Sequence, residues 1–182
     1  MIINEERYGI HVRNVDLNDA EFLFNLRSDK YLTRFISQFE GSLEDQKEWI
    51  RKYKEREDAG TEWYFMFLYN GERQGVARLY KIEEDHFTQG SWLFKPDAVA
   101  GCSILGNIIS SEIGFELPNK EYELTDARKG NRTHRWVKTF NPEFLYETDL
   151  DIFYKITKEN FNKAKIKHIE LCKKVMSLEH KI

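Results

Sequence analysis

Hydrophobic and polar residues follow two spacings along the chain, and each predicts one kind of element. Short alternating or aromatic-rich runs between turn residues predict strands over residues 7–15, 62–69, 74–82, 86–94, 122–128, 144–148 and 151–156. Apolar residues three and four positions apart predict helices over residues 16–29, 42–60, 101–115, 132–140 and 157–180. Asp16 and Ser42 are suitable N-caps for the first two helices, and Asn70-Gly71 is typical of a tight hairpin turn.

The order of these elements predicts the fold class. One strand and two helices precede three consecutive strands, and one helix then crosses over to the next strand. Segregated antiparallel strands with a single helical crossover favour an α+β fold with a mixed, mostly antiparallel sheet over a doubly wound α/β fold. The chain shows no internal repeat, linker or change of composition, so residues 1–182 are predicted to form one domain.

Composition narrows the class of protein. The chain carries 28 Lys and Arg against 31 Asp and Glu, a formal charge of −3, which argues against a basic nucleic-acid binder. Cys102 and Cys172 form no metal-spaced pair, so no metal site is predicted, and so few cysteines indicate a reducing compartment. The acidic start and a longest strongly apolar run of only Trp63–Tyr69 predict no signal segment and no membrane partner. We therefore expect a cytoplasmic protein.

The segment between the strand ending at Phe94 and the helix starting at Gly101 predicts an anion site. Main-chain N–H groups at a helix start attract negative charge, and small side chains let a phosphate approach the backbone. The segment is rich in such residues, namely Ala98, Ala100, Gly101 and Ser103. An ordinary helix start accounts for the same residues, so this loop alone does not decide between the two.

Several segments, in the predicted order of elements, resemble the GCN5-related N-acetyltransferase (GNAT) family, and specifically its ribosomal-protein-acetyltransferase-like branch. They are residues 8–29, Gln46 with Trp49, Gly75–Tyr80, Gly90–Pro96 and Asp126–Asn131. The resemblance covers about residues 8–156 and implies a three-layer α/β/α arrangement. The helix over residues 157–182 lies outside it.

The resemblance implies acetyl-CoA as co-substrate. The family's pyrophosphate signature aligns with Lys95-x-x-Ala98-x-Ala100 followed by Gly101, where Ala98 replaces the usual first glycine. It implies that main-chain groups of Trp92, Leu93 and Phe94 face the thioester, and that Asn131 leads the next helix beside the cofactor. The implied pyrophosphate contacts are the main-chain amides of Val99, Ala100, Gly101, Cys102 and Ser103, beside Ala98.

The catalytic residues are less well defined by the resemblance. The position seven residues after Asn131, where many members carry a tyrosine acid, is Lys138. His134 occupies the place of a serine used in the ribosomal-protein branch and is one candidate acid, although it could equally be a surface residue; Tyr146 is another. Gln89 and Ser91, expected on one face of their strand, are candidates to order a water, and Asp126 is a possible proton acceptor. The general base stays unassigned.

The acceptor is predicted to be a primary amine, borne by an amino sugar or another small molecule. Candidate acceptor-binding residues are Arg27, Phe35, Trp49, Tyr53 and Tyr80, together with Gln89 and Ser91. The guanidinium fork of Arg27 suits a phosphate or carboxylate. Acetylation of a protein N-terminus, a CoA-binding module without catalysis, and a purely structural scaffold are the alternatives.

The terminal helix carries an apolar stripe. It comprises Ala164, His168, Leu171, Val175 and Leu178, widened by Cys172 and Met176. Such a stripe must be covered by the sheet of its own domain or by a second copy of the chain. A homodimer is therefore a further prediction.

Overall fold

The computed structural model describes residues 1–36 and 39–179. The strands are β1 Asn4–Arg7, β2 Ile10–Asn14, β3 Trp63–Tyr69, β4 Glu72–Tyr80, β5 His86–Phe94, β6 Tyr122–Arg128, β7 Glu143–Glu147 and β8 Asp151–Thr157. The helices are the 3₁₀ turn η1 Leu17–Asp19, α1 Ala20–Ser28, α2 Leu43–Asp58, α3 Cys102–Glu116, α4 Thr133–Lys138 and α5 Lys158–Glu179. The predicted end of the terminal helix at His180 lies outside the described residues.

These strands form one sheet in the order β1-β2-β3-β4-β5-β6-β8-β7. Only β5 and β6 pair in parallel, because α3 crosses over between them, and the other neighbours pair antiparallel. The predicted α+β class with a mixed, mostly antiparallel sheet is confirmed.

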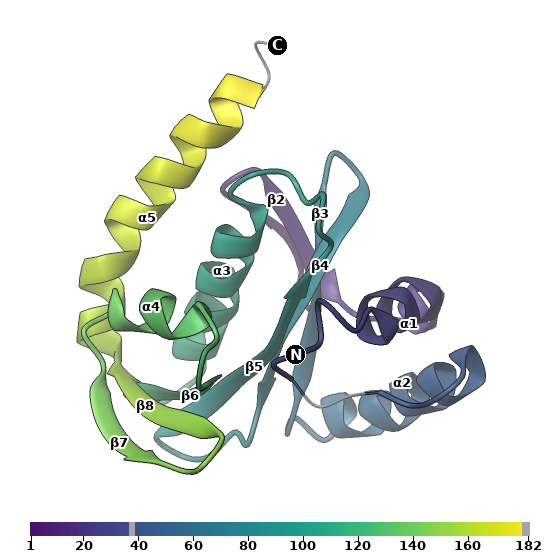
Figure 1. Ribbon diagram of the computed structural model, residues 1–182, viewed down its shortest axis with the longest axis horizontal. Helices are drawn as coiled ribbons and strands as arrows, with labels where there is room; N and C mark the ends of the chain where they lie inside the picture. The colour runs from purple at the N-terminus through teal and green to yellow at the C-terminus, as the bar shows by residue number, and fades with distance from the viewer. Residues whose placement is uncertain (37–38, 180–182) are drawn as a thin grey trace.

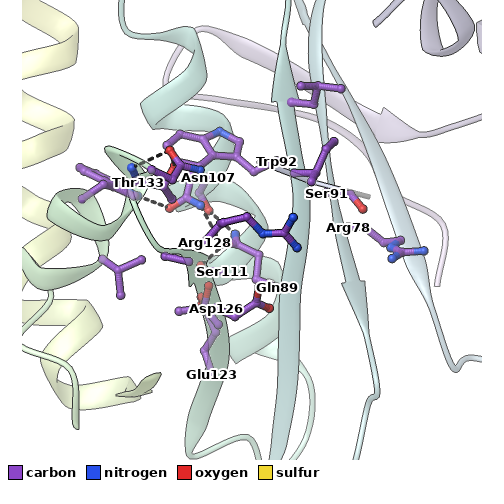
Figure 2. A pocket seen from close by; sticks show the side chains of 18 of the residues that line it. Arg78, Gln89, Ser91, Trp92, Asn107, Ser111, Glu123, Asp126, Arg128 and Thr133 are labelled. Carbon is purple, nitrogen blue, oxygen red and sulfur yellow. Dashed lines mark hydrogen bonds between the residues drawn. The ribbon is translucent and has the colours of Figure 1, made fainter. Parts of the chain in front are cut away.

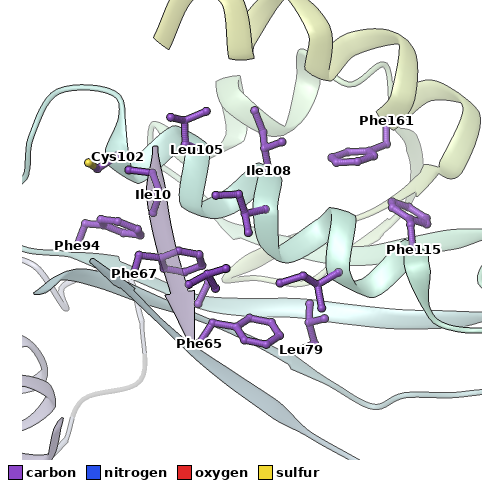
Figure 3. Packing of buried hydrophobic residues seen from close by; sticks show 14 of the residues in the cluster. Ile10, Phe65, Phe67, Leu79, Phe94, Cys102, Leu105, Ile108, Phe115 and Phe161 are labelled. Carbon is purple, nitrogen blue, oxygen red and sulfur yellow. The ribbon is translucent and has the colours of Figure 1, made fainter. Parts of the chain in front are cut away.

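Helices cover both faces of this sheet (Figure 1). On one face α1 and α2 pack through a cluster that includes Leu23, Ile50 and Tyr53. On the other face the apolar residues of α3 pack on aromatic strand residues, and Phe161 of α5 packs against Phe115 of α3, as Figure 3 shows. The three-layer arrangement implied by the family resemblance is therefore present.

The prediction of one strand over residues 7–15 is wrong, because the chain reverses within it. Tyr8 and Gly9 have φ values of 56° and 80°, and β1 pairs with β2 across them. Positive φ at both central residues is the geometry of a two-residue hairpin turn, which Gly9 adopts without steric cost. The short run thus forms two strands.

A bulge in β5 changes the direction of its side chains near the crossover. Gly90 pairs with Arg78 and Leu93 with Val76, so two residues of β5 lie opposite one of β4, and Ser91 has a φ of 50°. Gln89 consequently faces α3, whereas Ser91 lies on the opposite side of β5 beside Arg78 (Figure 2). The expectation that Gln89 and Ser91 share one face is wrong for this reason.

The terminal helix α5 packs along α3 and reaches the start of that helix. A Cβ atom at Gly101 would lie 3.3 Å from Cβ of Cys172 and 3.4 Å from Cγ of Met176. These two residues of the predicted stripe therefore cover the chain's own domain, whereas Leu171 is 57% exposed. The side chain of Leu178 lies outside the described part. None of the described helices is long and apolar enough to cross a membrane.

Candidate active site

A cavity of about 390 Å³ lies where β5 and β6 diverge. The two strands pair only from His86 with Tyr122 to Thr88 with Leu124, and they separate beyond those residues. Side chains from both faces of the sheet line the cavity, so it passes from the α3 face to the face covered by α1 and α2. A cavity with a few convergent polar groups is the expected place for a ligand.

On the α3 face, the cavity wall is a connected chain of hydrogen bonds (Figure 2). Trp136 Nε1 of α4 donates to Asn107 Oδ1 at 2.8 Å, and Asn107 Nδ2 donates to Gln89 Oε1 at 2.7 Å. Gln89 Nε2 in turn donates to the Asn107 carbonyl oxygen at 2.8 Å and to Ser111 Oγ at 3.1 Å. Each polar group is held by the next, so this wall is preorganised.

Glu123 of β6 is the last residue in this chain of hydrogen bonds. It was not identified from the sequence. Its carboxyl group is only 2% exposed, hydrogen bonds with Ser111, and has one oxygen, Oε2, without a partner in the described structure. Burial raises the pKa of Glu123 to about 7, and the hydrogen bond with Ser111 counters part of that rise. Glu123 is therefore a buried carboxyl group that can change protonation near neutral pH.

The opposite half of the cavity combines arginines with aromatic rings. Arg27 in the last turn of α1 and Arg78 of β4 line it together with Trp49, Tyr64 and Tyr80. The guanidinium of Arg78 lies 4.6 Å from the centroid of the Tyr80 ring and 5.9 Å from that of Trp49. Arg27 and Tyr80, both predicted to bind the acceptor, are thus brought together in this half, which we call the acceptor half.

Asp126 of β6 places a carboxyl group in the same half. Partial burial and the negative charge of Asp151 raise its pKa, while Arg128 and Lys81 lower it. Arg128 is engaged by Asp151, with 3.1 Å between Nε and Oδ1. Burial and the negative charge of Asp126 raise the pKa of Tyr80, and both side chains line the cavity. Asp126 can accept a proton or hold a cation there.

The loop before α3 follows directly after the β5 residues that line the cavity. Gly101 has a φ of 92° and caps α3, so the predicted helix start is present. The main-chain N–H of Val99 donates to Gln74 Oε1 at 2.9 Å, and that of Cys102 donates to the Val99 carbonyl oxygen at 3.0 Å. Ala98 packs on the hydrophobic core, and Ala100 also has an interaction partner. Some of the amides expected to bind pyrophosphate therefore already have partners.

The predicted β5 residues have two kinds of surroundings. Trp92 and Leu93 line the cavity, and Trp92 Nε1 donates to the carbonyl oxygen of Ser103 at 2.9 Å. Phe94 is buried and stacks on Phe67 with ring centroids 5.7 Å apart. Its side chain belongs to the core, which leaves only its main chain for the predicted role.

Neither candidate acid is among the residues that line the cavity. His134 of α4 has its Nδ1 2.7 Å from the hydroxyl of Tyr154 on β8, and its neighbours Thr133 and Trp136 form the cavity wall. Tyr146 is 53% exposed and stacks on Phe153. Asn131 lines the cavity, and its Oδ1 accepts from the N–H of Thr133 at 3.1 Å, which secures the start of α4.

The remaining predicted acceptor residues divide between cavity and core. Phe35 and Trp49 line the cavity. Tyr53 is fully buried, accepts from the N–H of Tyr64 at 2.9 Å and donates to Glu57, so it supports Tyr64 from behind. Within residues 1–36 and 39–179 no three His, Cys, Asp or Glu side chains are placed to hold a metal ion.

Comparison with solved structures agrees with this architecture. Apo FdhC, a nucleotide-linked sugar GNAT, has a TM-score of 0.82 and 29% identity over 92% of this chain and 97% of its own. The ribosomal-protein-S5-alanine acetyltransferase from Vibrio fischeri has a TM-score of 0.70 and 14% identity over 87% of this chain and 98% of its own. RimL, a ribosomal L7/L12 α-N-protein acetyltransferase in complex with coenzyme A, has a TM-score of 0.65 and 16% identity over 85% and 97%.

Sequence comparison adds the family. No curated protein shows significant similarity to the chain. The profile of the acetyltransferase (GNAT) domain family matches residues 10–105, more than half of the chain. The match runs from β2 through α1, α2 and the β5 bulge to the start of α3. Together with the diverging β5 and β6, this match shows that the chain belongs to the GNAT acetyltransferase family.

Proposed function

We propose that the protein is an acetyl-CoA-dependent N-acetyltransferase that acetylates the primary amine of a nucleotide-linked amino sugar. The observation that carries the proposal is the cavity that passes between β5 and β6, with a fixed polar wall on the α3 face and an arginine-rich, aromatic half on the other. The similarity to a nucleotide-linked sugar GNAT, at 29% identity over 92% of the chain, supports this class of acceptor.

The reaction that this arrangement supports is a direct transfer. The amine nitrogen attacks the thioester carbonyl carbon, a C–N bond forms, and the C–S bond breaks to release the CoA thiolate. The amine loses a proton, and the thiolate gains one. Main-chain groups of β5 beyond Thr88 have no β6 partner in the described structure, so those of Trp92, Leu93 and Phe94 that do not bond to β4 are our candidates to polarise the carbonyl group.

Asp126 is our proposed acceptor of the amine proton. It lies in the acceptor half near Tyr80, and its raised pKa makes it a better base than an ordinary aspartate. The role of His134 or Tyr146 as the acid stays a prediction. Acetyl-CoA is expected to run along the α3 face, with the main chain at Gly101 and Ser103 as the remaining candidate phosphate contacts in the loop.

The acceptor half favours a small molecule over a protein N-terminus. Phe35 and Ile36, from the segment between α1 and α2, contribute apolar side chains to its wall, which suits a small enclosed acceptor. The ribosomal-protein acetyltransferases compared above share 14% and 16% identity, which bears on the fold alone. Ribosomal N-terminal peptides therefore serve as the competing substrates in the test.

The experiment combines binding and turnover. Acetyl-CoA should raise the melting temperature of the protein, and free-thiol release should be fastest with a nucleotide-linked amino sugar among sugars, peptides and simple amines. Mass spectrometry should find one acetyl group on the acceptor amine. Stabilisation by acetyl-CoA without turnover of any amine would instead identify a CoA-binding module, and faster turnover of peptides would identify a protein N-terminal acetyltransferase.

The homodimer also stays a prediction. Ile166 and Leu171 of α5 are each 57% exposed, although Cys172 and Met176 pack on the same domain. Light scattering of the full chain at micromolar concentration tests it, and a monomer would show that α5 serves only its own domain.

A further inference from the structure

Two arginines in the acceptor half have unused hydrogen-bond capacity. The Nε atoms of Arg27 and Arg78 are both buried and have no hydrogen-bond partner in the described structure. Both side chains line the cavity, one from α1 and one from β4. A buried N–H of a charged guanidinium without a partner is costly, so two in one cavity point to a ligand that accepts from them.

The hydroxyl of Tyr64 brings the two guanidinium groups together. Burial raises the pKa of Tyr64, and the charges of Arg27 and Arg78 both lower it, which places both cations around the same phenol. Arg27 also donates a hydrogen bond to it. Tyr64 is only 2% exposed and is held by Tyr53 and Trp49, so its position is fixed by the core.

The protein balances the charges of these arginines only in part. Arg78 has a 3.4 Å contact with Glu62 Oε1, but the other oxygen of Glu62 lies 2.9 Å from Nε of Arg56. Arg27 stacks on Phe39, and no ion pair to it occurs in the described residues. Elsewhere in the acceptor half, Arg128 pairs with Asp151, and Asp126 remains as a negative charge near Tyr80.

This half of the cavity therefore has an excess of positive charge at Arg27 and Arg78 and a carboxylate at Asp126. A ligand that matches it carries an anion at one end and an ammonium group at the other. Guanidinium groups bind phosphate oxygens through their fork, and the rings of Trp49 and Tyr80 offer flat surfaces beside them.

We infer that Arg27 and Arg78 form a binding site for the diphosphate of the acceptor, with the amine directed toward Asp126. The inference rests on the proposed function for the identity of the amine, but not for the binding of the anion. It assigns two residues from different elements to one subsite and gives α1 a role in substrate specificity.

Isothermal titration calorimetry with uridine diphosphate and with inorganic pyrophosphate tests the site directly. CoA is present at saturation, so that the phosphate positions of CoA are already filled. We expect both probes to bind the wild-type protein, more weakly at higher ionic strength. Arg27→Gln and Arg78→Gln should each weaken binding of uridine diphosphate at least tenfold, and Arg78→Lys should weaken it less.

Arg51→Gln is the matched control, because Arg51 is exposed on α2 and pairs only with Glu48 among the described residues. The affinity of the Arg51→Gln variant for uridine diphosphate should stay within twofold of that of the wild type. Circular dichroism establishes that each variant is folded, and Arg78→Gln tests the site independently if Arg27→Gln does not fold.

Three results would overturn the inference: unchanged affinity in both arginine variants, binding of the two probes only when CoA is left out, or binding of a sugar carboxylate such as glucuronate, titrated in the same way, without binding of diphosphate. The failure of the proposed function looks different. If uridine diphosphate binds through both arginines but no amine is acetylated, the anion site stands and the transfer reaction is wrong. If amines are acetylated but the probes do not bind, the reaction stands and this inference fails.

Discussion

The two halves of the cavity use polar residues in opposite ways. On the α3 face, Asn107, Gln89, Ser111 and Trp136 satisfy one another through hydrogen bonds of 2.7–3.1 Å. On the acceptor face, Arg27 and Arg78 keep N–H groups without partners. The first pattern stabilises the folded protein and fixes the shape of the wall, whereas the second leaves binding capacity for a ligand. Polar residues of one cavity can thus serve stability on one side and recognition on the other.

The largest effect that we predict tests the acceptor half. Asp126→Asn should lower the maximal rate of acetyl transfer by about 10²–10⁴, because the amine loses its proton acceptor. In the wild type, activity should fall as the pH drops through the raised pKa of Asp126, since the protonated carboxyl group cannot act as a base. Steady-state kinetics across pH checks both statements.

The same variant should leave the free energy of unfolding within about 0.5 kcal/mol of the wild type, because Asp126 makes no hydrogen bond or ion pair among the described residues and part of its side chain is open to solvent. Asp58→Asn, an exposed position on α2, is the control for both measurements. If Asp126→Asn lowers the free energy of unfolding as well as the maximal rate, Asp126 also stabilises the fold. The contrast between a stabilising α3 half and a ligand-binding acceptor half would then fail.

The next prediction concerns the α3 half. Asn107→Leu leaves Gln89 Oε1 and Trp136 Nε1 without their partners in a buried site. Two unsatisfied buried groups should lower the free energy of unfolding by about 3 kcal/mol. Urea denaturation measures this, with Asn25→Leu on the exposed side of α1 as the control. Stability close to that of the wild type would show that the chain of hydrogen bonds contributes little.

A smaller effect depends on pH. The pKa of Glu123 is about 7 in the folded protein against an ordinary 4.5, so the folded state holds its proton more tightly than the unfolded state. The stability that this provides is present below pH 4.5 and is lost as the pH rises through 7. Between about pH 5 and pH 8 the wild type should lose about 2 kcal/mol relative to Glu123→Gln.

Urea denaturation of both proteins across this range gives the comparison. Glu121→Gln, at the exposed neighbouring position, should follow the wild type. Parallel curves for the wild type and Glu123→Gln would mean that Glu123 does not change its protonation within this range, and the carboxyl group would then not be a neutral-pH group of the cavity.

Local signals in the sequence were sufficient for most of the fold. Helical spacing and caps located α1, α2, α3 and α5, and Asn70-Gly71 located the β3–β4 turn, with φ values of 50° and 80° in the structure. These features depend on neighbouring residues, so a single sequence contains them. The resemblance to the family then supplied the three layers and the expectation that main-chain groups of β5 face the thioester.

The features that sequence reasoning missed depend on distant residues. The hairpin at Tyr8-Gly9 forms because β2 finds a partner in β3, 50 or so residues later in the chain. The bulge at Ser91 sits in a run that alternates normally, and only the register with β4 reveals it. Glu123 looks like a solvent-facing strand residue, and it is buried because α3 and β8 cover it. The alternation of polar and apolar residues therefore did not predict the directions of Ser91 and Glu123, which line the cavity.

The smallest predicted effect concerns His134. The ring of His134 faces Tyr154, and the cavity wall beside it is formed by Thr133 and Trp136. If that orientation holds during the reaction, no proton can pass directly from the imidazole into the cavity. His134→Ala should then lower the maximal rate less than threefold, and Tyr154→Phe, which removes the hydroxyl partner, should behave in the same way. Steady-state rates with acetyl-CoA at saturation decide this. A fall of about 10²–10⁴ for His134→Ala, with the affinity for acetyl-CoA unchanged, would instead support His134 as the acid that protonates the leaving thiolate.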